Sequence, residues 1–137
     1  DVAVLDVKLP HLPRWIEHRR HIASLYHEGL KGIHGLRLPP FDGPRQSDVF
    51  QNYVVRTAKR DALRAHLREA GVETLVHWQR PMWAHPALRI PDPGLPETAS
   101  LCREVLSLPM SAETSGADVA ATVDATRAWF AASMACA

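Results

Sequence analysis

Hydrophobic side chains recur at three- and four-residue steps through residues 15–30, and this spacing predicts an amphipathic helix with one apolar stripe. Pro10 and Pro13 lack amide donors and crowd the preceding turn, so we expect a break or kink there. Pro13 suits the first turn of the main helix, while Gly29 and Gly32 supply its end. The stripe consists of Leu12, Trp15, Ile16, Ile22, Ala23, Tyr26 and Leu30.

The middle of the chain predicts a strand–helix–strand unit. Residues 50–55 (FQNYVV) are aromatic and β-branched, which is typical of a strand. A helix is expected over residues 60–70, and Gly71 follows it where a left-handed C-cap is needed. Residues 72–76 then predict a second strand.

Two segments are predicted to be irregular. Residues 36–48 are proline-rich and read as a loop, with a short strand at 35–38. Residues 77–95 contain too many prolines for regular structure, and a loop this long in a small domain is usually functional or part of a binding surface. These prolines are Pro81, Pro86, Pro91 and Pro93.

The C-terminal part predicts two helices separated by a short strand or turn at 107–109. Pro96 can open the first helix, which we expect to run to about residue 106. The last helix begins near Ser115, whose hydroxyl can cap it while Asp118 completes the capping box. Its predicted apolar face consists of Val119, Val123, Thr126, Phe130 and Met134.

Length and composition indicate one globular domain covering residues 1–137, with 46% apolar and 23% charged residues. The net charge of +1 comes from interleaved charges of both signs, which argues against a nucleic-acid partner. We find no apolar run long enough for a membrane span and no export signal, and we expect a cytoplasmic protein. Cys102 and Cys136 are expected to be reduced thiols.

Several motifs, in the right order and spacing, resemble the DegT/DnrJ/StrS-type sugar aminotransferases. Residues 5–9 (LDVKL), followed by Trp15, Arg19–Arg20 and Tyr26, resemble the linking helix of that family. The other matching segments are FQNYVVR at 50–56, AGVET at 70–74, HW…P…HP at 77–86 and CREVLSLPM at 102–110. Together they cover nearly the whole chain.

This resemblance implies a homodimeric fold-type I enzyme that depends on pyridoxal 5'-phosphate (PLP). Such an enzyme has a large PLP-binding domain followed by a small domain, and it transfers an amino group from glutamate or glutamine to a keto group of a nucleotide-linked sugar or a cyclitol. The chain then corresponds to the C-terminal small domain. Its implied fold is α+β, with a small, mostly antiparallel sheet covered by helices and a long N-terminal linking helix.

The lysines agree with the interpretation as a fragment. A PLP enzyme needs a lysine whose neutral amine is favoured by its pocket. Lys8, Lys31 and Lys59 are the only lysines, and none has the sequence context of a cofactor lysine. The chain also opens as if in mid-helix and lacks a glycine-rich turn for the cofactor phosphate. We therefore expect no catalytic residue, no cofactor-binding residue and no PLP binding by this chain alone.

The resemblance places candidate substrate-binding residues in the loop at 77–95. Trp78 stands at a tyrosine position of the family and is expected to stack on a sugar or a nucleobase, and His77 to bond a hydroxyl or the diphosphate. Trp83 stands where the family often has histidine and His85 where glutamine is common, which bears on acceptor specificity. The alternatives are packing roles for the tryptophans and a surface role for His85.

Two strand residues have open assignments. The hydroxyl of Tyr53 is expected either at a domain or subunit boundary or in an ordinary half-buried strand position. Arg56 is able to anchor a donor carboxylate bidentately, but a structural ion pair with Asp61 or Glu73 is favoured.

The sequence leaves two other classes of function open. Eight histidines suggest a metal site, with His18 and His21 as an i, i+3 pair, but no zinc motif is present and no metal is expected. The second is a non-catalytic module that binds a nucleotide sugar or a partner. We also expect the apolar faces of helix 15–30 and of the last helix to be partly exposed, which would favour self-association.

Overall fold

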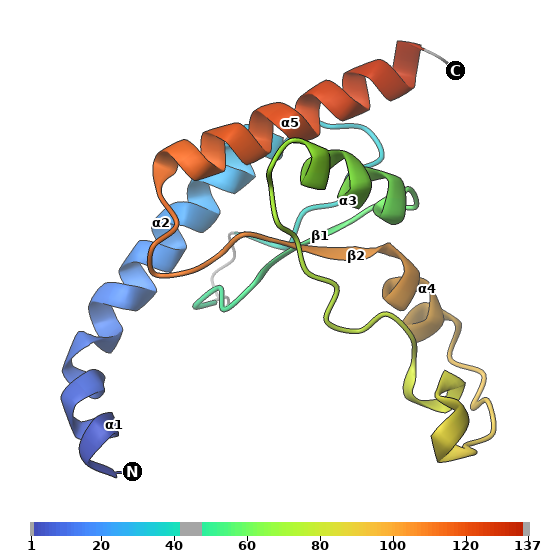
Figure 1. Ribbon diagram of the computed structural model, residues 1–137, viewed down its shortest axis with the longest axis horizontal. Coiled ribbons are helices and arrows are strands. Elements are labelled where there is room, and N and C mark those ends of the chain that lie inside the picture. Colours follow the sequence, from blue (N-terminus) through green and yellow to red (C-terminus); the bar gives the residue numbers. More distant parts are fainter. Residues whose placement is uncertain (1, 42–47, 136–137) are drawn as a thin grey trace.

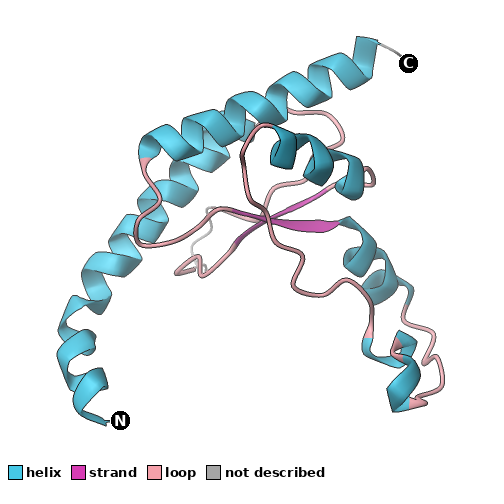
Figure 2. Ribbon diagram, in the orientation of Figure 1, coloured by secondary structure: helices cyan, strands magenta, loops and turns pink. Residues whose placement is uncertain are grey.

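The chain folds into a body of helices and strands (Figure 1; Figure 2). The N-terminal helical segment and the segment formed by residues 77–104 extend away from this body (Figure 1). The computed structural model describes residues 2–41 and 48–135. Predictions for residue 1, for residues 42–47 and for Cys136 lie outside this part, as does the Met134 side chain. The elements are α1 (Val2–Lys8), η1 (Leu9–His11), α2 (Leu12–Leu30), β1 (Tyr53–Arg56), α3 (Arg60–Glu69), η2 (Met82–Ala84), η3 (Pro86–Leu88), α4 (Pro96–Glu104), β2 (Val105–Leu108) and α5 (Gly116–Ala135).

The N-terminal helix is interrupted at its prolines, as predicted. Pro10 lies in the 3-10 turn η1, and Pro13 lies in the first turn of α2, where its missing amide costs no hydrogen bond. At the other end, the amide of Lys31 donates to the carbonyl of His27 at 3.0 Å. Gly32 follows with a φ of 79°, which glycine adopts without strain.

The small antiparallel sheet is confirmed, and it consists of β1 and β2 with the register Tyr53↔Leu108 and Val55↔Leu106. Single bridges, Arg37↔Arg56 and Leu75↔Ser107, extend it on both sides. The strands predicted at 35–38 and 72–76 are therefore reduced to one paired residue each.

The predicted boundaries of the two strands need correction. Residues 50–52 do not belong to β1, because Phe50 has a φ of 49° and turns the chain before Tyr53. The helix that opens at Pro96 ends at Glu104 rather than at residue 106, since Val105 is already extended and paired with Arg56. The segment predicted at 107–109 is thus the second half of β2.

Helices α2, α3 and α5 gather on one side of the strands (Figure 1). The strand residues that alternate toward this side are Tyr53, Val55, Leu106 and Leu108, and all are buried in the core. The capping box of α5 is also confirmed, because the Ser115 amide donates to Oδ2 of Asp118 at 2.8 Å and the Asp118 amide donates to Oγ of Ser115 at 3.2 Å.

Stacked aromatic rings join α2 to β1. The rings of Tyr26 and Tyr53 are 5.1 Å apart between centroids, and Phe50 lies 6.2 Å from Tyr53. The hydroxyl of Tyr26 donates to the carbonyl of Pro109 at 2.9 Å, and burial raises the pKa of Tyr26 to about 12. This contact fixes α2 against the segment that follows β2.

The expectation of exposed helix faces is correct only for the N-terminal end of the stripe. Ile22 and Tyr26 in α2, and Val119 and Phe130 in α5, are buried, because the two helices pack against each other and against the strands. Leu12 is 44% exposed. The other exposed large apolar side chains lie mainly on α1 and η1 or between residues 75 and 101: Val4, Leu5, Val7, Leu9, Leu75, Trp78, Met82, Leu88, Ile90, Leu95 and Leu101.

None of the described helices is long and apolar enough to cross a membrane.

The close approach of α2 to α5 depends on Gly29. A Cβ atom at this position would lie 2.7 Å from Cγ2 of Val123. We expect Gly29→Ala to lower the free energy of unfolding, measured in urea, by about 1–2 kcal/mol. Overpacking costs about 1–3 kcal/mol, and the better helix propensity of alanine offsets only part of it.

The control for this prediction is Val123→Ala, alone and combined with Gly29→Ala. Removing the Cγ atoms makes room for the new methyl group, so the double variant should be more stable than the sum of the single effects predicts. Strict additivity, or a Gly29→Ala protein as stable as the parent, would contradict the close contact.

Candidate functional site

Residues 77–104 form an arm that extends away from the helical body (Figure 1). The arm holds the turns η2 and η3 and returns to β2 through α4. Between these elements the prolines prevent regular structure, as expected for residues 77–95. The arm is thus a long excursion whose two ends meet at the sheet.

His77 and Trp78 lie at the base of the arm and line a pocket of about 380 Å³. The indole of Trp78 is 75% exposed, so it does not serve as a packing anchor in this structure. The remaining wall is largely apolar, and a mostly apolar pocket with a few polar groups is typical of small-molecule sites. Its other lining residues are Asn52, Val54, Leu75, Val76, Thr98, Leu101, Cys102, Val105 and Ser107.

The other candidate residues are not brought to this pocket. Trp83, half-buried in η2, and exposed His85 lie farther along the arm and are absent from the described residues that line it. Tyr53 is fully buried on the opposite face of the sheet, and its hydroxyl has no hydrogen-bond partner among the described residues. Burial raises the pKa of Tyr53, which therefore stays protonated.

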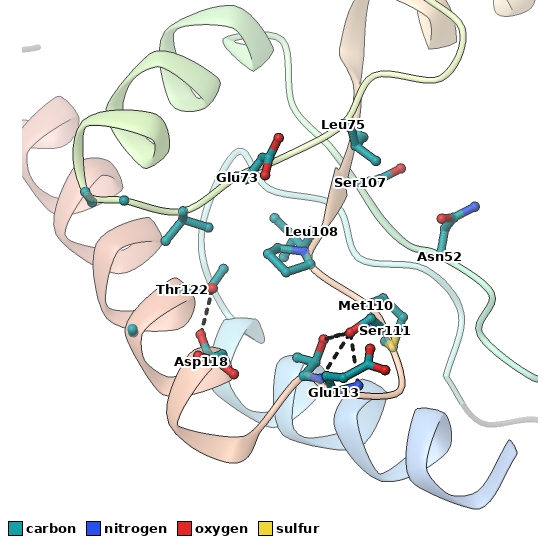
Figure 3. Close-up of a pocket in the computed structure, with 16 residues that line it drawn as sticks. Asn52, Glu73, Leu75, Ser107, Leu108, Met110, Ser111, Glu113, Asp118 and Thr122 are labelled. Carbon is teal, nitrogen blue, oxygen red and sulfur yellow. Dashed lines mark hydrogen bonds between the residues drawn. The ribbon is translucent and has the colours of Figure 1, made fainter. Parts of the chain in front are cut away.

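A second concavity, of about 650 Å³, borders the first one near the start of α5, and residues from both faces of β2 line it (Figure 3). Its wall carries the carboxylates of Glu73, Glu113 and Asp118. Asp118 accepts hydrogen bonds from Ser115, and these lower the pKa of its carboxyl group. We call this concavity the acidic pocket, and the one beside Trp78 the apolar pocket.

Asn52, Leu75 and Ser107 line both pockets. Sequence reasoning missed them as site residues. Alternation along residues 50–55 puts Asn52 opposite Tyr53, but it also puts Phe50 on the side of Asn52, whereas Phe50 turns the chain and its ring lies 6.2 Å from that of Tyr53. The proximity of Ser107, however, follows only from the pairing of β1 with β2, which connects positions about fifty residues apart.

Arginine side chains fix the arm to the sheet. Nε of Arg56 donates to Oε2 of Glu104 at 2.5 Å, and Oγ of Ser100 donates to Oε1 of the same carboxylate at 2.6 Å. Nη1 of buried Arg60 donates to the carbonyls of Cys102 and Val105 at 3.4 and 3.3 Å. These bonds hold the C-terminal end of α4, which forms part of the apolar pocket.

The ion pair predicted for Arg56 is present, but the predicted partners are wrong. Its close partner is Glu104, with Glu97 at 3.8 Å, because antiparallel pairing puts Arg56 opposite Val105 and so beside the end of α4. Asp61 instead lies 2.6 Å from Nε of Arg60.

The two histidines of the metal hypothesis, His18 and His21, have different surroundings. Nε2 of His18 is 3.1 Å from the carbonyl oxygen of Thr114, and His21 is exposed. Within residues 2–41 and 48–135, no group of three or more His, Cys, Asp or Glu side chains is arranged to hold a metal ion.

Comparison with known proteins now adds to this geometry. The model of the DegT/DnrJ/EryC1/StrS aminotransferase family matches residues 1–127. This chain belongs to that family. Its members are PLP-dependent aminotransferases.

Individual relatives match over most of this chain but only part of theirs. The chain is 37% identical over 130 residues (93% of it, 34% of the relative) to the dTDP-3-amino-3,4,6-trideoxy-alpha-D-glucose transaminase of Streptomyces venezuelae. It is 40% identical over 111 residues (79% and 30%) to the erythromycin biosynthesis sensory transduction protein EryC1 of Saccharopolyspora erythraea. The crystal structure of S. venezuelae DesV in complex with a ketimine intermediate superposes with a TM-score of 0.87, at 37% identity, over 93% of this chain and 35% of that one. The chain thus spans about a third of the length of these relatives.

The lysines of this family member do not fit a covalent PLP site. Lys8, Lys31 and Lys59 are all exposed, and Lys31 forms an ion pair with Glu28. A lysine that bonds PLP needs a pocket that favours its neutral amine, and none of these three side chains lies in such a pocket in this structure.

The carboxylate that holds the arm predicts a dependence of stability on pH. Hydrogen bonds from Ser100 and Arg56 lower the pKa of Glu104. A lowered pKa stabilises the folded state above the ordinary pKa of glutamate, and the contribution is lost as the pH falls through the lowered value. We expect Glu104→Gln to destabilise the protein at neutral pH and to lose less stability than the parent on acidification.

Urea unfolding at about pH 7 and about pH 3 measures this difference. Glu97→Gln is the matched control, because its carboxylate is 83% exposed and 3.8 Å from Arg56, where solvent weakens the interaction. Equal acid sensitivity of the parent and Glu104→Gln would rule out the proposed role of this carboxylate.

Proposed function

We propose that this chain is the C-terminal small domain of an enzyme that transfers an amino group from glutamate or glutamine to a keto group of a nucleotide-linked sugar or a cyclitol. The main observation in support of this proposal is the apolar pocket beside His77 and Trp78. Trp78 offers an exposed aromatic face, His77 offers a hydrogen-bonding imidazole, and the volume suits a sugar or a nucleobase. The name of the S. venezuelae relative, a dTDP-sugar transaminase, supports the substrate class.

In this proposal the chemistry is shared between two domains. PLP supplies the amino-group chemistry when bound, and the lysine that holds it belongs to the part of the protein outside this chain. The role of this chain is to cover the site and to bind the acceptor through the base of the arm. The exposed apolar side chains of α1, including Val4, Leu5 and Val7, suit contact with the PLP-binding domain or with a second subunit of a homodimer.

A second candidate is a non-catalytic module that binds a nucleotide sugar or a protein partner. The name of the relative from S. erythraea, a sensory transduction protein, favours it. The test that separates the two is a transamination assay of the intact protein with glutamate or glutamine and a set of dTDP-linked keto sugars. Formation of an amino sugar supports the enzyme, whereas binding without turnover supports the module.

Trp78 gives a test of the acceptor site. In the intact enzyme, Trp78→Ala should raise the KM for the keto sugar about tenfold and leave the KM for the amino donor nearly unchanged. The expected size corresponds to the loss of one aromatic stacking contact, about 1–1.5 kcal/mol. Steady-state kinetics with each substrate varied in turn gives both values.

The matched control is Met82→Ala, which removes another exposed apolar side chain of the arm, 64% exposed and outside the apolar pocket. It should leave both KM values unchanged. If Trp78→Ala raises the two KM values equally, Trp78 supports the structure of the site and does not bind the acceptor.

The absence of a buried lysine among the described residues predicts that this chain by itself holds no covalent PLP. After incubation with PLP, borohydride reduction and mass spectrometry, we expect no stoichiometric adduct on Lys8, Lys31 or Lys59. The intact protein treated in the same way should carry one adduct on a lysine outside this chain. A stoichiometric adduct on any of these three lysines would refute the division of labour between the domains.

A further inference from the structure

Ser107 is a buried polar residue whose hydroxyl is unused within the described structure. Its backbone pairs with Leu75 in both directions, at 2.8 and 3.1 Å, and the residue is only 6% exposed. Its side chain borders both the apolar and the acidic pocket, yet Oγ makes no hydrogen bond to any described residue. Oγ of Ser107 is not among the side-chain atoms of the described residues that are both buried and unpaired, so it is open to the pockets and can bond a partner that enters from one of them.

Asn52 lies on the same face of the sheet. Ser107 is the cross-strand neighbour of Val54. Asn52, which stands just before β1, lines the apolar pocket together with Val54 and lines both pockets together with Ser107. The carboxamide of Asn52 is exposed, and Figure 3 shows it beyond the Ser107 hydroxyl, on the side to which that hydroxyl points. We call these two side chains, which line both pockets, the Asn52–Ser107 ridge.

The surroundings of the ridge restrict what it can bind. On one side the acidic pocket carries Glu73, Glu113 and Asp118, and its described lining contains no Lys, Arg or His. This pocket repels anions. On the other side the wall is mostly apolar, with His77 as its basic group.

A ligand that fits this setting presents neutral hydroxyl groups to the ridge and a nonpolar surface to Val54 and Leu75. Both ridge side chains can donate and accept hydrogen bonds, as adjacent hydroxyls of a sugar require. A pyranose ring has this character, since its hydroxyls lie at its edge and its C–H groups on its faces.

We propose that the Asn52–Ser107 ridge binds the ring hydroxyls of the sugar in a nucleotide-linked substrate. The carboxylates of the acidic pocket then repel the diphosphate, which lies along the apolar pocket toward His77. The position of the diphosphate in turn determines the orientation of the sugar. This inference rests on the proposed function and extends it, because it adds two specificity-determining residues and an orientation.

The test compares dTDP-glucose with dTDP by calorimetry on the intact protein, since the difference between their affinities isolates the sugar. We expect Asn52→Ala and Ser107→Ala each to weaken binding of dTDP-glucose by about three- to tenfold, the size of one hydrogen bond, and to leave dTDP binding unchanged. Ser107→Ala should melt at the parent temperature, because the hydroxyl makes no bond within the described chain.

Gln51→Ala is the control for Asn52→Ala, because Gln51 is the exposed neighbour on the chain and lines neither pocket. It should bind both ligands like the parent. Three outcomes would contradict binding of the sugar by the ridge. The ridge variants could weaken the binding of both ligands equally or leave both affinities unchanged, or the parent could bind dTDP-glucose no better than dTDP. Should Ser107→Ala fail to fold, Asn52→Ala decides the matter alone.

The calorimetric and transamination experiments distinguish an error in the proposed role of the ridge from an error in the proposed function. If the intact protein aminates a dTDP-linked keto sugar while the ridge variants keep the affinity for dTDP-glucose, only the ridge is wrong. If the intact protein aminates none of them, the proposed enzyme is wrong, whatever the ridge variants do in calorimetry.

Discussion

The antiparallel pairing of β1 with β2 is the interaction on which the rest of the structure depends. Its register places Tyr53 opposite Leu108 and Val55 opposite Leu106, so one face of the sheet meets the helices. The same register directs Val54 and Ser107 to the other face, where they line the apolar pocket together with Asn52. A shift of one residue would exchange the two faces, and both the core and the candidate site would be lost together.

Polar contacts at the ends of the strands preserve this arrangement. The hydrogen bonds from Arg56 and Arg60 hold α4 where β2 begins, and the hydroxyl of Tyr26 holds the chain where β2 ends. These side chains bond mainly groups that the ends of helices and strands leave unpaired. The positions of the strands and of α4 therefore determine the shape of the apolar pocket, although the pocket lies at the base of a long irregular segment.

Local patterns in the sequence located the main helices, although they put the end of the helix that opens at Pro96 too late. The proline break before α2, the left-handed Gly71 after α3 and the capping box of α5 depend on residues within a few positions of each other. The strands were predicted less well. Phe50 belongs to the aromatic run FQNYVV but turns the chain, and residues 72–76 have strand propensity but gain only the bridge at Leu75. Strand formation depends on a partner that is distant in the sequence, and local propensity does not contain that information.

The same reason explains what could be predicted of the site. His77 and Trp78 were found from a motif, whereas Asn52 and Ser107 come together only through the pairing of distant segments, which also brings Glu73 near Glu113 and Asp118. Tyr53 was predicted as a substrate-binding residue but lies in the core, away from the residues of the loop. Alternation along a strand tells which residues share a face, but it does not tell which face the helices cover.

The arm leaves the sheet and returns to it at one place, and this has a consequence for how such a domain changes over time. The entropy lost on closing a loop grows only with the logarithm of its length, so residues added or removed between Trp78 and α4 cost little free energy. The helical body does not need the tip of the arm for its core. The segment proposed to meet the acceptor is thus also the segment that can be lengthened, shortened or rewritten most freely, and new substrates can be acquired there without rebuilding the fold.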